Sequence, residues 1–236
     1  EYARLIEGLR FHQNELEALA SSRIAPYLPD DASVDQVFVW APVCFTGDWA
    51  TPSMSGANLP QIKRGWRSIV GATSGGAYRG YIVRRIDAQT ATGSWNAPMG
   101  FDPNRWDLVR DLMFTTVVEG SVDFVADPAS TVDPRTIAEG AELFQACLEA
   151  ILDAEHVEHP RALVESVRGD GSTLGRFGRH LAARIAERDG RRAVTELVER
   201  GGAAFVRRAI EIELEDPELT PDLKPVYRDV VTRLPG

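Results

Sequence analysis

The chain has few of the residues from which metal and disulfide sites are built. It contains four histidines and two cysteines among 236 residues. Two cysteines, Cys44 and Cys147, make no disulfide framework in a chain of this length, which favours a reducing compartment. The most apolar run, residues 37–45, is much shorter than the roughly 20 residues that cross a bilayer. We therefore expect a cytoplasmic protein with no membrane segment.

Positive charge is also scarce. Thirty-five acidic residues against 26 basic ones give a net charge of −9. A field of this sign repels phosphate backbones, so no nucleic-acid partner is expected. The chain also lacks a phosphate-binding glycine loop, a Gly-x-Ser-x-Gly turn and a dinucleotide fingerprint. With 44% hydrophobic residues it has enough apolar surface for a full core.

Helical periodicity accounts for most of the chain. Residues 36–43 form the one convincing strand, because they are apolar and rich in β-branched and aromatic side chains. Residues 46–60 and 89–101 have the composition of loops. Helices are expected over residues 2–20, 61–88, 103–126, 134–152, 160–168, 173–189, 191–200, 202–214 and 221–233. The fold class that follows is α+β, mainly α, with a small sheet.

Two local patterns sharpen these helices. Asp102-Pro103 and Asp133-Pro134 each place an N-cap carboxylate before a proline at the first helical position. The helix over 61–88 contains four glycines, at 71, 75, 76 and 80, and each costs roughly 1 kcal/mol relative to alanine. Either another element packs closely against this helix, or the glycines leave room for a ligand.

Three short motifs carry a family resemblance. Tyr27-Leu-Pro precedes the strand, Gly80-Tyr81 lies on the glycine-rich helix, and Glu119-Gly-Ser-Val-Asp123 lies on the next helix. The pattern resembles the gluzincin-type zinc-dependent peptidase-like proteins, especially a short bacterial group. There, one helix carries His-Glu-x-x-His followed by Gly-aromatic, and a later helix carries Glu-Gly-x-Ala-Asp. The resemblance covers roughly residues 20–210.

This resemblance implies a single zincin-like domain over residues 1–236. Its sheet and cleft helices would occupy residues 30–125, and a helical region would occupy residues 130–236. Within the cleft, Glu119 takes the place of the family's third zinc ligand, and Asp123 that of the group that steadies a histidine.

The chain departs from the family where the metal would be held. Ser74, Gly75 and Tyr78 stand at the positions of the first histidine, the catalytic glutamate and the second histidine. Zinc needs three protein ligands and a nearby base, whereas serine and tyrosine are poor neutral ligands and glycine is no base. We therefore expect no metal and no other cofactor. The lost side-chain volume predicts a larger, metal-free pocket.

The expected function is to bind, and to transform by acid or base chemistry, a small organic molecule or short peptide in this pocket. A carboxylate between apolar walls suits proton transfer. The candidate catalytic residues are Glu119, Tyr78, Asp123 and Ser74, and the candidate substrate-binding residues are Tyr81, Trp40 and Arg85.

Other interpretations of the same residues stay open. Glu119 and Asp123 also fit a helix face bonded to backbone or to Arg79, Arg84 or Arg85, and the tyrosines fit core or rim aromatics. At the level of function, the alternatives are a zinc-dependent hydrolase with unusual ligands and a non-catalytic pseudoenzyme that binds a partner protein. Neither the substrate nor the oligomeric state follows from these patterns.

Overall fold

Helices make up most of the described chain. The computed structural model describes residues 7, 11–30, 32, 38–40, 49–51, 54–56, 66–88, 95–153, 158–167 and 172–234. Its helices are α2 (Gln13–Ile24), η1 (Ala25–Tyr27), α4 (Trp66–Ala88), α5 (Pro103–Met113), η2 (Phe114–Glu119), α6 (Gly120–Ala126), α7 (Pro134–Asp153), α8 (Glu158–Ser166), α9 (Thr173–Asp189), α10 (Arg191–Glu199), α11 (Gly202–Glu215) and α12 (Leu223–Arg233). The mainly α class is confirmed.

Three short strands are described beside α4. They are β1 (Phe38–Trp40), β2 (Trp49–Thr51) and β3 (Met54–Gly56), in the order β1-β3-β2. β1 runs parallel to β3, with Val39 opposite Ser55, and β2 runs antiparallel to it. β1 lies within the strand expected at 36–43, whereas β2 and β3 fall in a segment expected to be loop. The zincin-like character of the fold stays a prediction.

The two predicted start signals are confirmed in atomic detail. The Asp102 side chain accepts a hydrogen bond from the Asn104 amide at 2.9 Å, with Pro103 at the first helical position. Asp133 accepts from the Arg135 amide at 2.8 Å in the same way. Both caps satisfy amides that have no partner within their helix.

A π-helical segment interrupts the run from Pro103 to Ala126. Residues of η2 make wider turns between α5 and α6, and helical backbone angles continue through both junctions. The hydroxyls of Thr115 and Thr116 donate to the carbonyls of Asp111 and Leu112 at 3.1 and 3.0 Å. Such π segments are rare and are frequent at functional sites. This one carries Glu119 at its last position.

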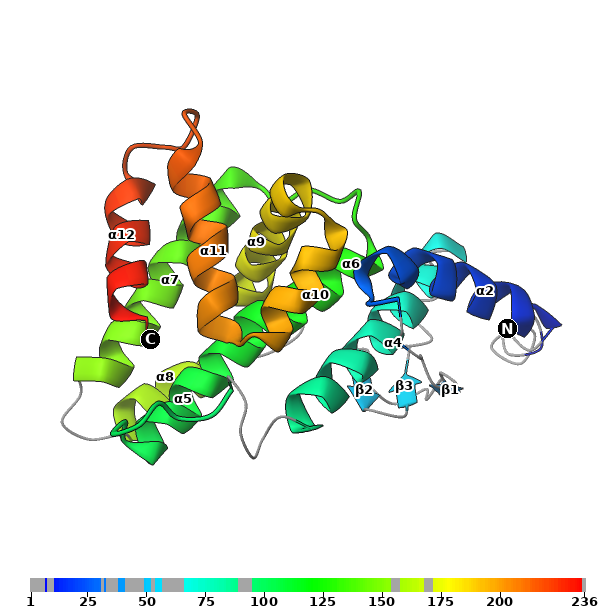
Figure 1. The fold of residues 1–236 in the computed structure, drawn as a ribbon, viewed down its shortest axis with the longest axis horizontal. Coiled ribbons are helices and arrows are strands. Elements are labelled where there is room, and N and C mark those ends of the chain that lie inside the picture. The colour runs from blue at the N-terminus through cyan, green and yellow to red at the C-terminus, as the bar shows by residue number, and fades with distance from the viewer. Residues whose placement is uncertain are drawn as a thin grey trace.

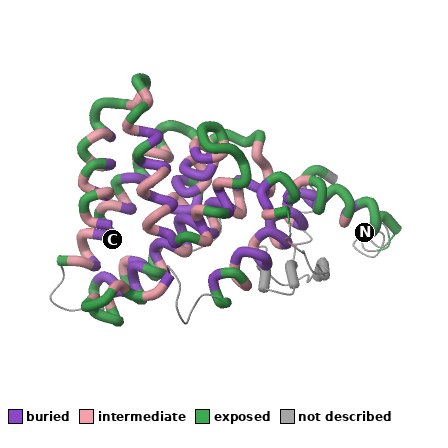
Figure 2. Tube along the Cα trace, in the orientation of Figure 1, coloured by how far each residue is buried: buried purple, intermediate pink, exposed green. Residues whose placement is uncertain are grey.

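α9 lies among the helices of the C-terminal half of the chain. Figure 1 shows α9 behind α10 and α11, with α7 and α12 on one side, whereas α2, α4 and the strands form the opposite end of the molecule. α9 packs against η2, α6, α7, α10 and α11. Its residues Leu174, Phe177, Leu181 and Ile185 are all at most 1% exposed. Buried residues gather in the interior of the helical assembly, where the tube of Figure 2 is purple.

One apolar cluster extends through the described chain. It begins at Ile24, passes through the middle of α4 at Tyr78 and Ile82, and reaches Leu234 after α12. Its size is consistent with the 44% hydrophobic content. The α4 end and the α12 end are therefore linked by continuous side-chain packing.

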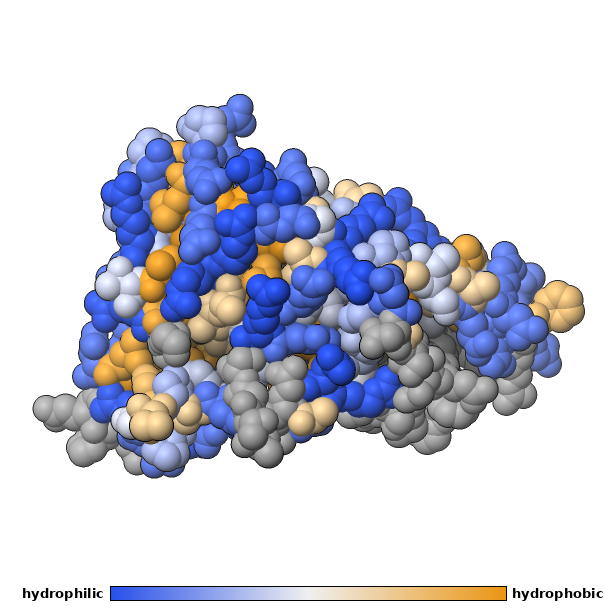
Figure 3. Space-filling view, viewed as in Figure 1, coloured by the Kyte–Doolittle hydropathy of each residue, from blue (hydrophilic) through white to orange (hydrophobic). Residues whose placement is uncertain are grey.

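Hydrophilic side chains dominate the face of the molecule in Figure 3, and hydrophobic ones gather in seams between helices. Among the described residues, the large hydrophobic side chains that are exposed are Phe11, Leu19 and Met99. Within the described helices, none combines the length and the apolar character needed to cross a bilayer.

Candidate functional site

The two helices that the sequence places around a pocket do lie against each other. α4 and the η2–α6 segment run antiparallel: Arg79 contacts Glu119, and a Cβ built on Gly75 would contact Val122. A Cβ on Gly71, one turn earlier, would lie 3.0 Å from the Ala126 carbonyl oxygen. The two helices are thus in contact through Arg79, Gly75 and Gly71, whereas the predicted site residues Ser74, Tyr78, Tyr81 and Arg85 of α4 bond to other partners.

Glu119 is held by an arginine rather than by apolar walls. Arg79 Nη2 donates to Glu119 Oε1 at 2.8 Å, and Arg79 Nε donates to the same oxygen at 3.1 Å and to Oε2 at 3.3 Å. The two side chains are 25% and 30% exposed. The arginine-bound alternative is confirmed, and the expectation of apolar walls around Glu119 is wrong. The Arg79 guanidinium also lies 5.7 Å from the centre of the Phe114 ring, within cation–π range.

The space freed at Gly75 is filled. A Cβ built there would meet Ala126 Cβ at 3.2 Å and Val122 Cγ1 at 3.4 Å. Val122 and Ala126 of α6 therefore occupy the space beside Gly75. At this position the predicted larger pocket is wrong, because interiors pack to high density and α6 occupies the space.

Ser74 forms a hydroxyl hydrogen bond within its own helix. It is fully buried, and its hydroxyl donates to the Val70 carbonyl of its own helix at 2.6 Å. This bond satisfies the hydroxyl within one turn of α4. Ser74 is therefore committed to its helix and is not presented to a ligand.

Tyr78 joins α4 to α10. It is fully buried, and its hydroxyl lies 3.0 Å from Thr195 Oγ1, so the two groups share a hydrogen bond across 117 positions of sequence. Burial raises the pKa of Tyr78 well above 10, although hydrogen bonds with Thr195 and Ser121 oppose the shift. A neutral, enclosed hydroxyl of this kind is a packing anchor.

Tyr81 and Arg85 meet on one carboxylate. The Tyr81 hydroxyl donates to Glu199 Oε1 at 3.1 Å, and Arg85 Nε donates to the same oxygen at 3.0 Å. Both therefore fasten α4 to the end of α10. Trp40 lies in β1, and its side chain is outside the described residues.

Asp123 lies beside Arg179, which caps the C-terminal end of α6. Arg179 of α9 donates to the Asp123 carbonyl oxygen at 2.8 Å, to the Ser130 carbonyl at 2.9 Å and to the Asp127 carbonyl. Burial lowers the pKa of Arg179, and Asp123 and Asp127 oppose this shift. Arg23 donates to Ala126 O at 2.5 Å, so two guanidiniums satisfy the carbonyls that end α6. The side chain of Asp123 is half-buried at this junction.

Glycines also bring α9 onto η2. A Cβ on Gly178 would lie 1.6 Å from the Thr116 carbonyl oxygen, and one on Gly120 would lie 2.4 Å from the Gly178 carbonyl carbon. No side chain fits at either crossing. η2 and α6 therefore pack against α9 as well as against α4.

Sequence reasoning missed the partners that come from α9 and α10. Thr195, Glu199 and Arg179 each bond to a predicted site residue or to its helix. Thr195 and Glu199 lie on α10, whose sequence reads as an ordinary amphipathic helix. Nothing near them in sequence indicates that they bond to α4. Within the described residues, no three histidine, cysteine, aspartate or glutamate side chains are grouped to hold a metal ion.

Comparison with known proteins adds no relative: no family model, no curated protein and no solved structure matches this chain.

Proposed function

We propose that this chain is a metal-independent, non-catalytic binding protein with a zincin-like arrangement of α4 and η2–α6. The observation that carries the proposal is the filling of the space at Gly75 by Val122 and Ala126. A catalytic glutamate and a metal-bound water would need this space. In this proposal α4 and η2–α6 correspond to the helices that frame a metallopeptidase cleft, and the contacts at Gly75 support packing in place of a cleft.

The chemistry of the remaining polar groups also favours binding over catalysis. Glu119 is engaged by two nitrogens of Arg79, so both of its carboxylate oxygens already accept hydrogen bonds within the protein. Tyr78 has a raised pKa and is enclosed, so it supplies no phenolate at neutral pH.

The exposed side of the Arg79–Glu119 pair is the binding surface that we propose. Each of the two side chains is at least a quarter exposed to solvent, and the Phe114 ring lies beneath the guanidinium. A charged pair beside an aromatic ring suits a peptide, whose backbone offers donors and acceptors and whose side chains offer apolar groups. The resemblance to peptidase-like proteins favours a short peptide as the ligand.

Peptide binding can be measured directly with an array of randomised octapeptides. We expect selected peptides to bind without being cleaved, with a Kd that EDTA leaves unchanged. Arg79→Ala should raise that Kd by roughly tenfold or more, whereas Arg135→Ala, which removes an exposed guanidinium on α7, should leave it unchanged. Cleavage of bound peptides that EDTA abolishes would overturn the proposal.

Acid or base chemistry at Glu119 is the second candidate, and its 30% exposure favours it, because a small substrate could reach the carboxylate. In that case Glu119→Gln would lower turnover by about 10²–10⁴-fold. A Glu119→Gln variant that binds peptide and shows only altered stability would reject this candidate.

A further inference from the structure

The guanidinium of Arg79 contacts both ends of the π-helical segment η2. It lies 5.7 Å from the centre of the Phe114 ring, and it donates to Glu119 Oε1 at 2.8 Å. Phe114 is the first residue of η2, and Glu119, five positions later, is the last. The binding surface proposed above therefore requires that η2 present positions i and i+5 to one partner.

An α-helix does not place such a pair of residues on one face. With about 3.6 residues per turn, positions i and i+5 lie about 140° apart around the helix axis. The position one α-helical turn after Phe114 is that of Val118, which is a fully buried core residue. A π-helix instead joins residues i and i+5 by its backbone hydrogen bonds, which brings Glu119 to the side of Phe114. The shared contact with Arg79 therefore depends on the π geometry.

A backbone contact with α9 lies in the middle of this π segment. A Cβ on Gly178 would lie 1.6 Å from the Thr116 carbonyl oxygen, and one on Gly120 would lie 2.4 Å from the Gly178 carbonyl carbon. The Thr116 carbonyl is therefore directed against the backbone of α9, at a position where no side chain fits. Because π segments are rare, a tertiary contact that only glycine permits is the feature that holds this one in place.

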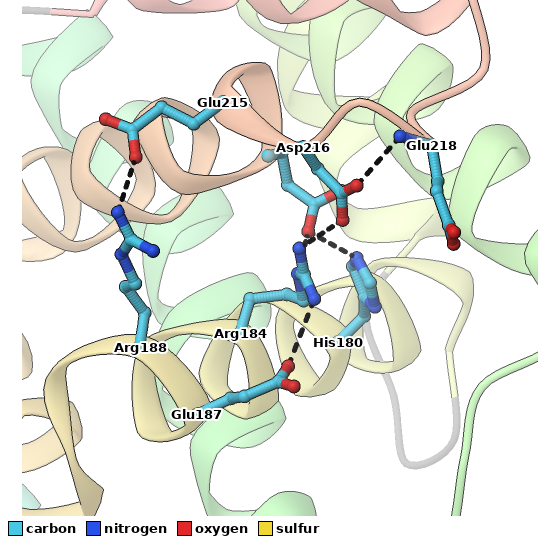
Figure 4. Close-up of polar contacts among 8 residues, drawn as sticks. His180, Arg184, Glu187, Arg188, Glu215, Asp216 and Glu218 are labelled. Atoms are coloured by element: carbon cyan, nitrogen blue, oxygen red, sulfur yellow. Dashed lines mark hydrogen bonds and ion pairs between the residues drawn. The ribbon is translucent and has the colours of Figure 1, made fainter.

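The C-terminal half of α9 is fixed at its junction with α11. Arg184 of α9 donates to Glu213 of α11 at 2.5 Å and to Asp216, the residue that follows α11, at 2.5 Å. Arg188, one turn further along α9, pairs with Glu215. Figure 4 shows both arginines extending from α9 toward the end of α11. These ion pairs and the buried stripe of α9 resist a movement of α9 away from η2.

We propose that Gly178 is a positioning residue for the peptide-binding surface. Because it has no side chain, Gly178 admits the Thr116 carbonyl and so holds the π turn of η2. The π turn in turn sets Phe114 and Glu119 together against Arg79. This inference rests on the proposed function for the identity of the ligand, whereas the arrangement of the three side chains can be measured without any peptide.

The coupling between Arg79 and Glu119 is the measurement that needs no ligand. A double-mutant cycle with Arg79→Ala and Glu119→Ala should show a coupling of about fivefold or more in the unfolding equilibrium constant of the parent. In a Gly178→Ala background we expect this coupling to fall below about twofold, because Glu119 is displaced from Arg79. The control is Val230→Ala, which truncates a buried side chain of α12, a helix that packs on α7 and α11. It should lower stability and leave the coupling unchanged.

Peptide binding is the second measurement, with a peptide selected on the array. Gly178→Ala should raise its Kd by about tenfold or more at a temperature at which circular dichroism shows the variant to be folded, and Val230→Ala should leave it unchanged. If Gly178→Ala does not fold, Thr115→Val/Thr116→Val is the substitute, because it removes the hydroxyl bonds of η2 to the preceding turn and keeps side-chain volume. It should lower the coupling and weaken peptide binding by about threefold each.

Three results would overturn the inference. They are a coupling that survives unchanged in the folded Gly178→Ala variant or in its valine substitute, an equal loss of coupling in Val230→Ala, and a peptide Kd that the same variants leave at the parent value. Failure of the proposed function has a different signature. In that case the parent binds no peptide, whereas the coupling between Arg79 and Glu119 still depends on Gly178.

Discussion

The polar groups at the α4–η2 interface and those at the α9–α11 junction are satisfied to different degrees. Around α4, two nitrogens of Arg79 engage Glu119 and the Tyr78 hydroxyl shares a hydrogen bond with Thr195 of α10, although the buried Thr73 hydroxyl has no hydrogen bond among the described residues. At the second, carboxylates outnumber guanidiniums and a buried tyrosine hydroxyl has no partner among the described residues. The interface that carries the sequence motifs is closed by packing at Gly75, whereas the junction without motifs has more carboxylates than guanidiniums.

The difference shows that residues at motif positions need not be available for chemistry. At the α4–η2 interface the helices close on one another, and Val122 against Gly75 is the contact in which they do so. At the α9–α11 junction a surface groove of about 320 Å³ is open beside Arg184, Glu187 and Asp216. Mutations at the interface should therefore act through packing, and mutations at the junction should act through charge.

The largest expected effect comes from breaking the helix crossing that supports η2. Gly178→Ala places a methyl group 1.6 Å from the Thr116 carbonyl oxygen, and backbone must move to admit it. We expect a loss of about 4 kcal/mol or more in the free energy of unfolding, measured by denaturant titration. Gly175→Ala is the control in the same helix, because its Cβ would meet only Ser172 Oγ at 3.3 Å. A Gly178→Ala variant as stable as the control would show that η2 and α9 are not in contact.

The next effect concerns the charge balance at the α9–α11 junction. Glu213→Gln removes the carboxylate shared by Arg184 and His180, and we expect a loss of about 3 kcal/mol at pH 7. Burial raises the pKa of Glu213, but His180 and Arg184 outweigh it, so the net shift is downward from 4.5. The stabilisation is therefore complete above about pH 4.5 and is lost as the pH falls through the lowered pKa.

Unfolding of the parent and the Glu213→Gln variant across this pH range provides the check. The stability gap between the two proteins should shrink on acidification below about pH 4.5. A gap that is constant from pH 7 to pH 3 would mean that the carboxylate charge of Glu213 does not stabilise the fold.

A smaller effect separates two buried tyrosines. Tyr78→Phe should cost about 1 kcal/mol, because the Thr195 hydroxyl loses its partner. Tyr227→Phe should be neutral or slightly stabilising, because its hydroxyl is buried without a hydrogen bond in the described chain. Thermal unfolding of both variants measures the difference directly. Equal losses of stability would contradict the difference in hydrogen bonding between the Tyr78 and Tyr227 hydroxyls.

Local chemistry was sufficient to predict most helix boundaries. Asp102-Pro103 and Asp133-Pro134 begin α5 and α7, and Gly190 and Gly201 separate α9, α10 and α11, as the patterns indicate. These signals act within a few residues, so they can be read from the sequence. The π-helical turns of η2 could not be, because the apolar period before and after them is that of an α-helix.

The candidate site was predictable only in part. The pairing of the glycine-rich helix with the helix of Glu119 follows from the motifs, and Arg79 was one of the arginines named as a partner. The prediction of a larger pocket is wrong because the space is filled by a contact between Gly75 and Val122, which lie far apart in sequence. Tyr78 and Thr195, and the groups around Arg184, likewise meet only through the packing of α9, α10 and α11.

Unfolding of the parent protein in the presence of zinc or EDTA tests the central claim, that the α4–η2 interface is closed by packing without a metal. The same midpoint is expected in about 1 mM EDTA and in about 0.1 mM zinc, because a metal that binds the folded state would raise the midpoint by mass action. Elemental analysis should find no stoichiometric zinc in protein purified without added metal. About one zinc per chain, together with a midpoint that EDTA lowers and Glu119→Ala makes insensitive to EDTA, would contradict the claim.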